Sequence, residues 1–258
     1  MTLHDLFDLD GRVAIVTGGA TGIGRQMAQG LAEAGADLVL CARKADRCEE
    51  AAAHLAGTGV RTIGLGCDVR DPEQVQAVVG RARAEFGRVD ILVNNAGTVW
   101  GAPPEDTPLE GWQKVIDVNL TGVFLCSQAA GRVMIDQGKG GKIVNIASVA
   151  AFRGGPQEVM NAIAYNASKG GVVSFTRDLA CKWARHGINV NAIAPGWFPS
   201  DMSNFVLEPH RDATLGRIPL GRFGGPDDLK GAVVYLASRA SDWVTGHTLV
   251  VDGGQSAW

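Results

Sequence analysis

The chain has 258 residues, of which 46% are hydrophobic and 20% are charged, and its formal net charge is 24 − 27 = −3 with neutral histidines. This composition describes an ordinary globular protein with a sizeable core, and the charge argues against a nucleic-acid or anionic-membrane partner. The five cysteines have no CxxC spacing, so the sequence suggests no metal site and no disulfide framework. The first residues do not resemble a signal peptide, and no apolar run approaches the roughly 18 residues that span a bilayer. We therefore expect a cytoplasmic protein without a membrane partner.

The first elements are a strand, a glycine-rich turn and a helix. The β-branched run Arg12–Thr17 predicts a strand buried on both faces, and the turn Gly18–Gly24 leads from it into a helix that ends near Ala34. Glycines at such a turn let the backbone approach a pyrophosphate, whose charge is met by the N–H groups of the helix N-terminus. The turn therefore predicts dinucleotide binding, and a tight turn without a ligand is the alternative.

The second strand, Asp37–Cys41, is followed by Ala42, Arg43 and Lys44. In dinucleotide-binding folds this position meets the adenosine ribose, where a carboxylate would bind the 2′-hydroxyl and an Arg would accommodate a 2′-phosphate. No carboxylate is present here, because Asp46 falls in the first turn of the next helix. The sequence therefore favours NADP(H) over NAD(H).

Strand-like and helix-like segments continue to alternate to the end of the chain. Further strands are predicted at Val60–Gly66, Val89–Val93, Gly141–Ala147, Gly187–Ile193 and Thr248–Asp252. Further helices are predicted at 45–57, from Asp71 to about Phe86, Trp112–Gln137, from Tyr165 to about His186, and Pro226–Ser238. This order predicts one α/β domain over residues 1–258, a Rossmann-type doubly wound parallel sheet of about seven strands with helices on both faces. The mixed segment at about 197–225 is expected on the substrate side.

A tyrosine and a lysine lie four residues apart in the stretch Ala164–Gly170. On a helix this spacing puts Tyr165 and Lys169 on one face, and a cation beside a phenol favours the phenolate and lowers its pKa. Such a tyrosine can exchange a proton near neutral pH. On its own, such a pair is more often an ordinary feature of an amphipathic helix.

Motifs along the whole chain occur in a recognisable order. They are Thr17-Gly-Gly-Ala-Thr-Gly-Ile-Gly24, Asp68, Asn94-Asn-Ala-Gly97, Asn119, Ser148, Tyr165 with Lys169, Pro195-Gly196 and Asp252-Gly-Gly254. Together they resemble the short-chain dehydrogenase/reductase family. The resemblance implies a catalytic tetrad of Asn119, Ser148, Tyr165 and Lys169. In it, Tyr165 exchanges the proton, Ser148 holds the substrate oxygen and Asn119 anchors a water; Lys169 lowers the phenol pKa and holds the nicotinamide ribose.

The glycine turn and the resemblance also assign residues to the cofactor. They are Gly18, Thr21, Gly22, Ile23, Gly24, Arg43, Lys44, Asp68, Val69, Asn95, Ala96, Gly97, Tyr165, Lys169, Pro195, Gly196, Phe198 and Ser200. The sequence departs from the family at two places. Ser200 stands where the family usually has Thr, and Ser148 and Tyr165 are 165 − 148 = 17 residues apart, a longer spacing than usual.

The substrate is less strongly indicated than the reaction. The stretches Asn94–Gly101 and Ile188–Ser200 are similar to 3-oxoacyl reductases, whereas Leu6–Arg12 and Gln29–Gly35 are similar to gluconate 5-dehydrogenases. The candidate pocket residues are mostly apolar: Val99, Trp100, Phe152, Val159, Met160, Trp197, Phe198, Met202 and Phe205.

We therefore rank reduction of a 3-oxoacyl thioester or another hydrophobic ketone first. Gluconate-type oxidation, with Arg153 as the cation for the carboxylate, ranks second. A cofactor-binding protein without turnover ranks third. The resemblance also implies a homotetramer built through the long helices that follow the fourth and fifth strands.

Overall fold

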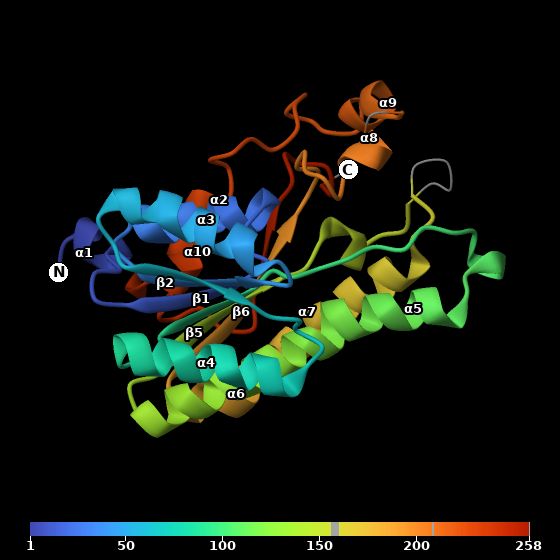
Figure 1. Ribbon diagram of the computed structural model, residues 1–258. Coiled ribbons are helices and arrows are strands. Elements are labelled where there is room, and N and C mark those ends of the chain that lie inside the picture. Colours follow the sequence, from blue (N-terminus) through green and yellow to red (C-terminus); the bar gives the residue numbers. More distant parts are fainter. Residues whose placement is uncertain (156–159, 208, 258) are drawn as a thin grey trace.

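The computed structural model describes residues 1–155, 160–207 and 209–257, and the side chains of 205 and 206 lie outside the description (Figure 1). Its centre is one parallel sheet in the order β3-β2-β1-β4-β5-β6-β7. The strands are β1 Val13–Thr17, β2 Asp37–Ala42, β3 Thr62–Gly66, β4 Ile91–Asn94, β5 Gly141–Ile146, β6 Ile188–Pro195 and β7 Thr248–Val251. The chain reverses its direction of travel across the sheet after β3. The predicted doubly wound sheet of seven strands is thus confirmed.

The strands are buried because their side chains alternate between two cores. On β1, Ala14 and Val16 belong to one hydrophobic cluster and Ile15 belongs to the other. The same alternation occurs on β4, where Ile91 points to the first cluster and Leu92 to the second. A continuous apolar run is therefore what this position in the sheet requires, since both faces are covered.

Helices cover each face of the sheet (Figure 1). The face of the first cluster carries α2 Gly22–Glu33, α3 Ala45–Leu55 and α10 Lys230–Ala237. The opposite face carries α4 Pro72–Phe86, α6 Gly122–Gln137 and α7 Ile163–Trp183. Short helices complete the chain: α1 Leu3–Phe7, α5 Leu109–Ile116, α8 Asn204–Leu207 and α9 Arg211–Leu215.

The helix expected at Trp112–Gln137 differs from the structure in one respect. It begins earlier, at Leu109, and a π-helical turn at Asp117–Thr121 separates α5 from α6. A π turn accommodates one extra residue and often marks a functional site. Asn119, one of the predicted catalytic residues, lies inside this turn.

By length and composition alone, the continuous helix Leu109–Gln137 is long and apolar enough to cross a membrane. This differs from the expectation that no segment reaches that threshold. The same helix contacts α4, β4 and β5, and a core helix passes the same test.

The segment 197–225 is not as irregular as its composition indicates. It contains α8 and α9, and Leu207, Ile218 and Phe223 form a small cluster of their own. In Figure 1 these two helices stand apart from the main helical layers, beyond one end of the sheet.

Candidate active site

The main candidate is a cavity of about 790 Å³ at the carboxyl ends of the strands, where ligands bind in doubly wound sheets. Most of the predicted site residues line it: Gly18, Thr21, Gly22, Ile23, Gly24, Asn95, Ala96, Gly97, Ser148, Tyr165, Lys169, Pro195, Gly196, Phe198 and Ser200. The other predicted residues, Arg43, Lys44, Asp68, Val69 and Asn119, lie outside its lining. The fold thus brings the glycine turn and three of the four predicted catalytic residues into one space.

Tyr165 and Lys169 reach this cavity from α7, and Ser148 reaches it from the end of β5. The Lys169 ammonium donates to the carbonyl oxygen of Ile146 at 2.6 Å and lies 5.6 Å from the centroid of the Tyr165 ring. Ser148 Oγ accepts a hydrogen bond from the amide of Ala150 at 3.1 Å. The helix spacing and the strand end therefore place the phenol between a hydroxyl and a buried cation.

Burial controls the acidity of both groups on α7. Lys169 is 4% exposed, and loss of water lowers its pKa from 10.5 to about 8. Burial also raises the pKa of Tyr165, and a hydrogen bond with Ser148 opposes that rise. We expected Lys169 to lower the phenol pKa. In the structure desolvation of the phenol outweighs any such effect, and Ser148 supplies the opposing contribution.

Asn119 is completely buried and its side chain is committed to other protein groups. Its amide accepts from the backbone N–H of Thr98 at 2.8 Å and donates to the carbonyl oxygen of Thr98 at 3.0 Å. The second amide hydrogen goes to Ser168 Oγ at 3.1 Å, and that hydroxyl donates to the carbonyl oxygen of Tyr165 at 2.7 Å. The side chain therefore ties the segment after β4 to the helix that carries Tyr165.

The glycine turn is packed too closely for side chains. A Cβ atom on Gly24 would lie 2.3 Å from the carbonyl oxygen of Gly18, and Gly18 itself has φ +64°. Asn95 Nδ2 donates to the carbonyl oxygens of Thr17 at 3.0 Å and of Gly18 at 3.1 Å. Asn95 thus fixes the turn against β4. Because Gly18 and Gly24 have no Cβ atom, the backbone of the turn stays open to a ligand.

The N-terminus of α2 is open to an anion. Thr21 occupies the N-cap position without a side-chain cap, so the first N–H groups of the helix keep their donor capacity. Arg25, in the first turn, also lines the cavity. These features fit the pyrophosphate of a dinucleotide, and the sequence analysis missed Arg25 because its orientation depends on the turn before it.

The other wall of this region comes from the end of β6. A Cβ atom on Gly196 would lie 2.7 Å from Cβ of Asp252, so only glycine fits between β6 and the segment after β7. Ser200 lies against the glycine turn, since a Cβ atom on Gly22 would be 3.5 Å from its Cβ. Its hydroxyl is 3.1 Å from Ser203 Oγ.

The residues predicted for the adenosine end lie along the edge of the site. Asp68 forms a two-point ion pair with Arg70, with 3.0 Å between Oδ1 and Nε and 2.6 Å between Oδ2 and NH2. This pairing lowers the pKa of Asp68, and Arg43 contributes to the lowering. Arg43 and Lys44 are exposed, whereas Val69 is buried in the second core cluster. Arg70, which the sequence did not single out, thus neutralises Asp68 and leaves Arg43 and Lys44 as the exposed cations after β2.

The apolar residues proposed for the pocket are only partly correct. Five of them line the cavity: Val99, Met160, Trp197, Phe198 and Met202. Trp100 is outside the lining because its indole packs against Gly111, with Lys114 5.2 Å from the ring centroid. Phe152 is also outside the lining and is 46% exposed. Val159 and the side chain of Phe205 lie outside the described residues.

Polar side chains supply the rest of this wall. Arg153, the cation suggested for a carboxylate, lines the cavity together with six polar residues besides Arg25 that sequence reasoning missed: Asn166, Asp201, Ser203, Thr214, Arg217 and Gln255. Thr214 is 2% exposed, and its hydroxyl has no hydrogen-bond partner among the described residues. The substrate wall is therefore more polar and more cationic than the sequence indicated.

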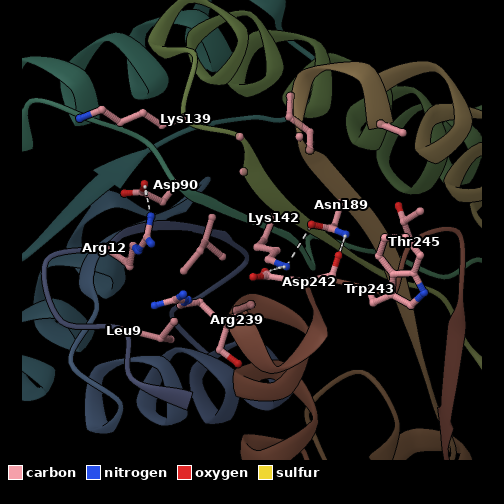
Figure 2. A pocket seen from close by; sticks show the side chains of 18 of the residues that line it. Leu9, Arg12, Asp90, Lys139, Lys142, Asn189, Arg239, Asp242, Trp243 and Thr245 are labelled. Atoms are coloured by element: carbon pink, nitrogen blue, oxygen red, sulfur yellow. Dashed lines mark hydrogen bonds and ion pairs between the residues drawn. The ribbon is translucent and has the colours of Figure 1, made fainter. Parts of the chain in front are cut away.

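A second cavity, of about 580 Å³, opens at the amino ends of β4, β5 and β6 (Figure 2). Two pairs of its charged groups form ion pairs: Arg12 with Asp90 at 3.3 Å, and Lys142 with Asp242 at 2.8 Å. Lys142 also donates to Asn189 Oδ1 at 3.0 Å. None of the predicted site residues lines this cavity, so the reaction centre is assigned to the opposite end of the sheet.

Comparison with known proteins agrees with this geometry. Residues 18–256 match the family model described as enoyl-(acyl carrier protein) reductase. The chain is 45% identical over 250 residues to the 2-dehydro-3-deoxy-D-gluconate 5-dehydrogenase of Escherichia coli K12, covering 96% of each protein. It is 39% identical to the gluconate 5-dehydrogenase of Gluconobacter oxydans, covering 98% of each.

The solved structures extend the likeness to the whole fold. A short-chain type dehydrogenase/reductase from Mycobacterium marinum superimposes with a TM-score of 0.95, at 40% identity and over 100% of both chains. The chain belongs to the short-chain dehydrogenase/reductase family. A second member, a gluconate 5-dehydrogenase from Burkholderia cenocepacia J2315 in complex with NADP and tartrate, superimposes with a TM-score of 0.94 at 39% identity over 100% of both chains. As a member of this family, the protein is an oxidoreductase that acts on CH–OH groups.

Proposed function

We propose that the protein is an NADP(H)-dependent dehydrogenase that interconverts a secondary hydroxyl group and a ketone on a sugar acid of the gluconate type. The observation that carries the proposal is a guanidinium in the reaction cavity: Arg153 lines the same space as Tyr165. A carboxylate on the substrate needs such a partner, since Arg pairs with carboxylates through a planar fork of donors. The names of the similar proteins point in the same direction.

Sequence reasoning ranked a 3-oxoacyl thioester first, but the similar proteins and the cavity favour its alternative, the gluconate-type substrate. Several of the similar proteins are named for sugar acids, although another is a D-threitol dehydrogenase, and the cavity wall carries Arg153, Thr214 and Arg217 beside its apolar residues. An acyl chain would leave the buried Thr214 hydroxyl without a partner and would offer no counter-charge to Arg153, which is costly. A sugar acid offers hydroxyl groups and a carboxylate to the same groups.

The residues of the chain divide the work of this reaction. When bound, the nicotinamide cofactor accepts or supplies the hydride. Tyr165 takes up the hydroxyl proton in oxidation and returns it to the ketone oxygen in reduction, and Ser148, which is hydrogen-bonded to Tyr165, holds that oxygen. The buried Lys169 ammonium lies 5.6 Å from the centroid of the Tyr165 ring, and the glycine turn with the N-terminus of α2 holds the pyrophosphate.

A substrate panel tests the proposal. Initial rates are measured with purified protein on gluconate, 2-dehydro-3-deoxygluconate, a neutral polyol and a 3-oxoacyl thioester, each with the NAD and NADP forms of the cofactor. We expect the highest kcat/KM with a sugar acid and an NADP cofactor. A higher kcat/KM on the thioester would overturn the proposal. A lack of turnover on the whole panel, despite cofactor binding, would favour the cofactor-binding protein without catalysis.

A further inference from the structure

The segment after β7 turns back into the molecule. Gly253 and Gly254 have φ values of +64° and +87°, a pair of left-handed conformations that side chains disfavour. The Asp252 carboxylate closes the turn by accepting from the amides of Gly254 at 2.9 Å and Ser256 at 2.7 Å. As a result Gln255 is 1% exposed and lines the reaction cavity. The turn formed by the Asp-Gly-Gly motif therefore buries the residue that follows it.

Gln255 accepts three hydrogen bonds from two residues of the cavity wall. Its backbone carbonyl oxygen accepts from Arg153 NH1 at 3.0 Å. With the amide oriented to satisfy the donors that face it, its side-chain oxygen accepts from Arg153 NH2 at 2.6 Å and from Trp197 Nε1 at 3.1 Å. Gln255 thus binds both terminal nitrogens of the Arg153 guanidinium and also holds the indole of Trp197.

The partner that holds Arg153 is uncharged. Among the residues that the structure describes, Arg153 forms no ion pair with a carboxylate, and Asp201, which also lines the cavity, is not one of its hydrogen-bond partners. A guanidinium has five N–H donors, and the contacts with Gln255 use two of them. The remaining donors and the full charge are available to a ligand in the cavity.

We infer that Gln255 is a positioning residue that orients Arg153 as the carboxylate partner of the substrate, an inference that rests on the proposed function. A buried neutral acceptor holds the guanidinium in place without competing with the substrate for its charge. A glutamate at the same position would hold it equally well but would neutralise it. Gln255 therefore sets the preference for an acid over a neutral polyol. It takes no part in the proton transfer, which belongs to Tyr165.

The test compares gluconate with sorbitol, in which a hydroxymethyl group replaces the carboxylate. In Gln255→Glu we expect KM for gluconate to rise by about 10- to 150-fold, the loss that follows when a charge-assisted hydrogen bond is removed. kcat for gluconate and kcat/KM for sorbitol should change little. Gln76→Glu, an exposed position on α4, is the matched control for the added negative charge.

A second variant keeps the test informative if Gln255→Glu does not fold. Gln255→Leu removes the side-chain acceptor without adding charge, and it should also reduce the ratio of kcat/KM for gluconate to that for sorbitol. In an Arg153→Ala background the same substitution should have no further effect on that ratio, because residues that act through each other are not additive.

The outcomes separate the inference from the proposed function. If the wild-type protein does not prefer gluconate to sorbitol, the proposed function fails. If the wild-type protein prefers gluconate but both Gln255 variants have the same ratio of kcat/KM for gluconate to kcat/KM for sorbitol as the Gln76→Glu control, the inference alone is overturned. A loss of kcat on both substrates by the same factor would also overturn it, since that is the effect of a purely structural residue.

Discussion

Among the cationic residues that line the cavity, Lys169 is the most deeply buried. Its folded-state pKa of about 8 lies below the ordinary value of 10.5, so between these pH values the unfolded chain binds more protons than the folded one. Stability contributed by this group therefore rises as the pH rises from about 8 to 10.5. The difference between the two pKa values corresponds to about 3 kcal/mol.

We therefore predict a pH-dependent difference between the wild-type protein and Lys169→Met. Relative to the variant, the free energy of unfolding of the wild type should increase by about 3 kcal/mol across this pH window. Urea denaturation at neutral and alkaline pH measures it. A constant gap at all pH values would mean that the ammonium is not desolvated as the structure indicates.

Tyr165 carries the proton in the proposed reaction. Tyr165→Phe keeps the ring but removes the hydroxyl group, so turnover should fall by about 10²–10⁴-fold, the usual contribution of general acid–base catalysis. NADPH binding, followed by fluorescence titration, should be nearly unchanged. Tyr235→Phe on α10 alters the only other tyrosine of the chain and serves as the control. Near-normal turnover of Tyr165→Phe would refute the assignment.

Arg43 is the residue on which the cofactor preference is predicted to depend. It is exposed after β2, with Lys44 beside it and no carboxylate at Ala42. Arg43→Ala together with Ala42→Asp should weaken the binding of NADPH by roughly 10- to 150-fold, because a charge-assisted hydrogen bond to the 2′-phosphate is lost. The affinity for NADH, which lacks this phosphate, should change little. The measurement is kcat/KM for both cofactors, and an unchanged preference would show that other residues decide it.

Residues with a fixed local context could be predicted from the sequence, whereas residues brought in from a distance could not. Tyr165 and Lys169 share a helix face by their spacing, and Ser148 follows a strand that ends at the site. Gln255 reaches Arg153 only because a turn after the last strand folds back across the cavity, a contact over 102 residues of sequence. Arg70 was missed because its ion pair with Asp68 depends on side-chain orientation.

At the scale of elements, the glycine turn shows how close packing limits substitution. In Gly24→Ala the new methyl group would meet the carbonyl oxygen of Gly18 and the amide of Asn95, each at 2.3 Å. The turn would have to shift, so we predict a loss of NADPH affinity of at least tenfold. Gly80→Ala is the control, since nothing lies within 4 Å of a Cβ there, and it should stabilise α4 by about 0.5–1 kcal/mol. Isothermal titration and thermal unfolding measure the two effects.

Seven strands and the main helices could be predicted because apolar runs and turn residues mark them in the sequence. Their ends were less certain: β4 starts at Ile91 rather than Val89, and α10 starts at Lys230 rather than Pro226. The π turn and helices α8 and α9 could not be predicted. Their geometry is set by contacts with other elements, such as the hydrogen bonds of Asn119 to Thr98, and not by local periodicity.

At the scale of the whole molecule, exposed apolar side chains lie on the surfaces where we expect subunits to meet. Phe124 on α6 and Ile163 on α7 are 44% and 46% exposed, and Val250 on the edge strand β7 is 39% exposed. Trp243, before that strand, is fully exposed. Two separate apolar surfaces of this kind suit a tetramer with two kinds of two-fold interface.

We predict a homotetramer in solution, with a dimer as the alternative. Light scattering at micromolar concentration should give the tetramer mass, and Phe124→Glu should reduce it by placing a charge in one interface. Glu73→Ala, at an exposed position on α4, is expected to leave the mass unchanged. A monomer mass for the wild type would contradict the prediction.

The π turn at Asp117–Thr121 also determines how the chain can change in length. Each residue advances the rotation by about 100° in an α-helix but by less in the wider π turn, so this turn takes up one extra residue while α5 and α6 stay nearly in phase. In this arrangement the Trp100 indole faces Gly111 and α5 contacts α7, and a residue added or deleted elsewhere in the helix would rotate these contacts by about 100°. Insertions and deletions are usually tolerated in loops, and we expect this helix to tolerate a one-residue change in length at the π turn more readily than elsewhere along it.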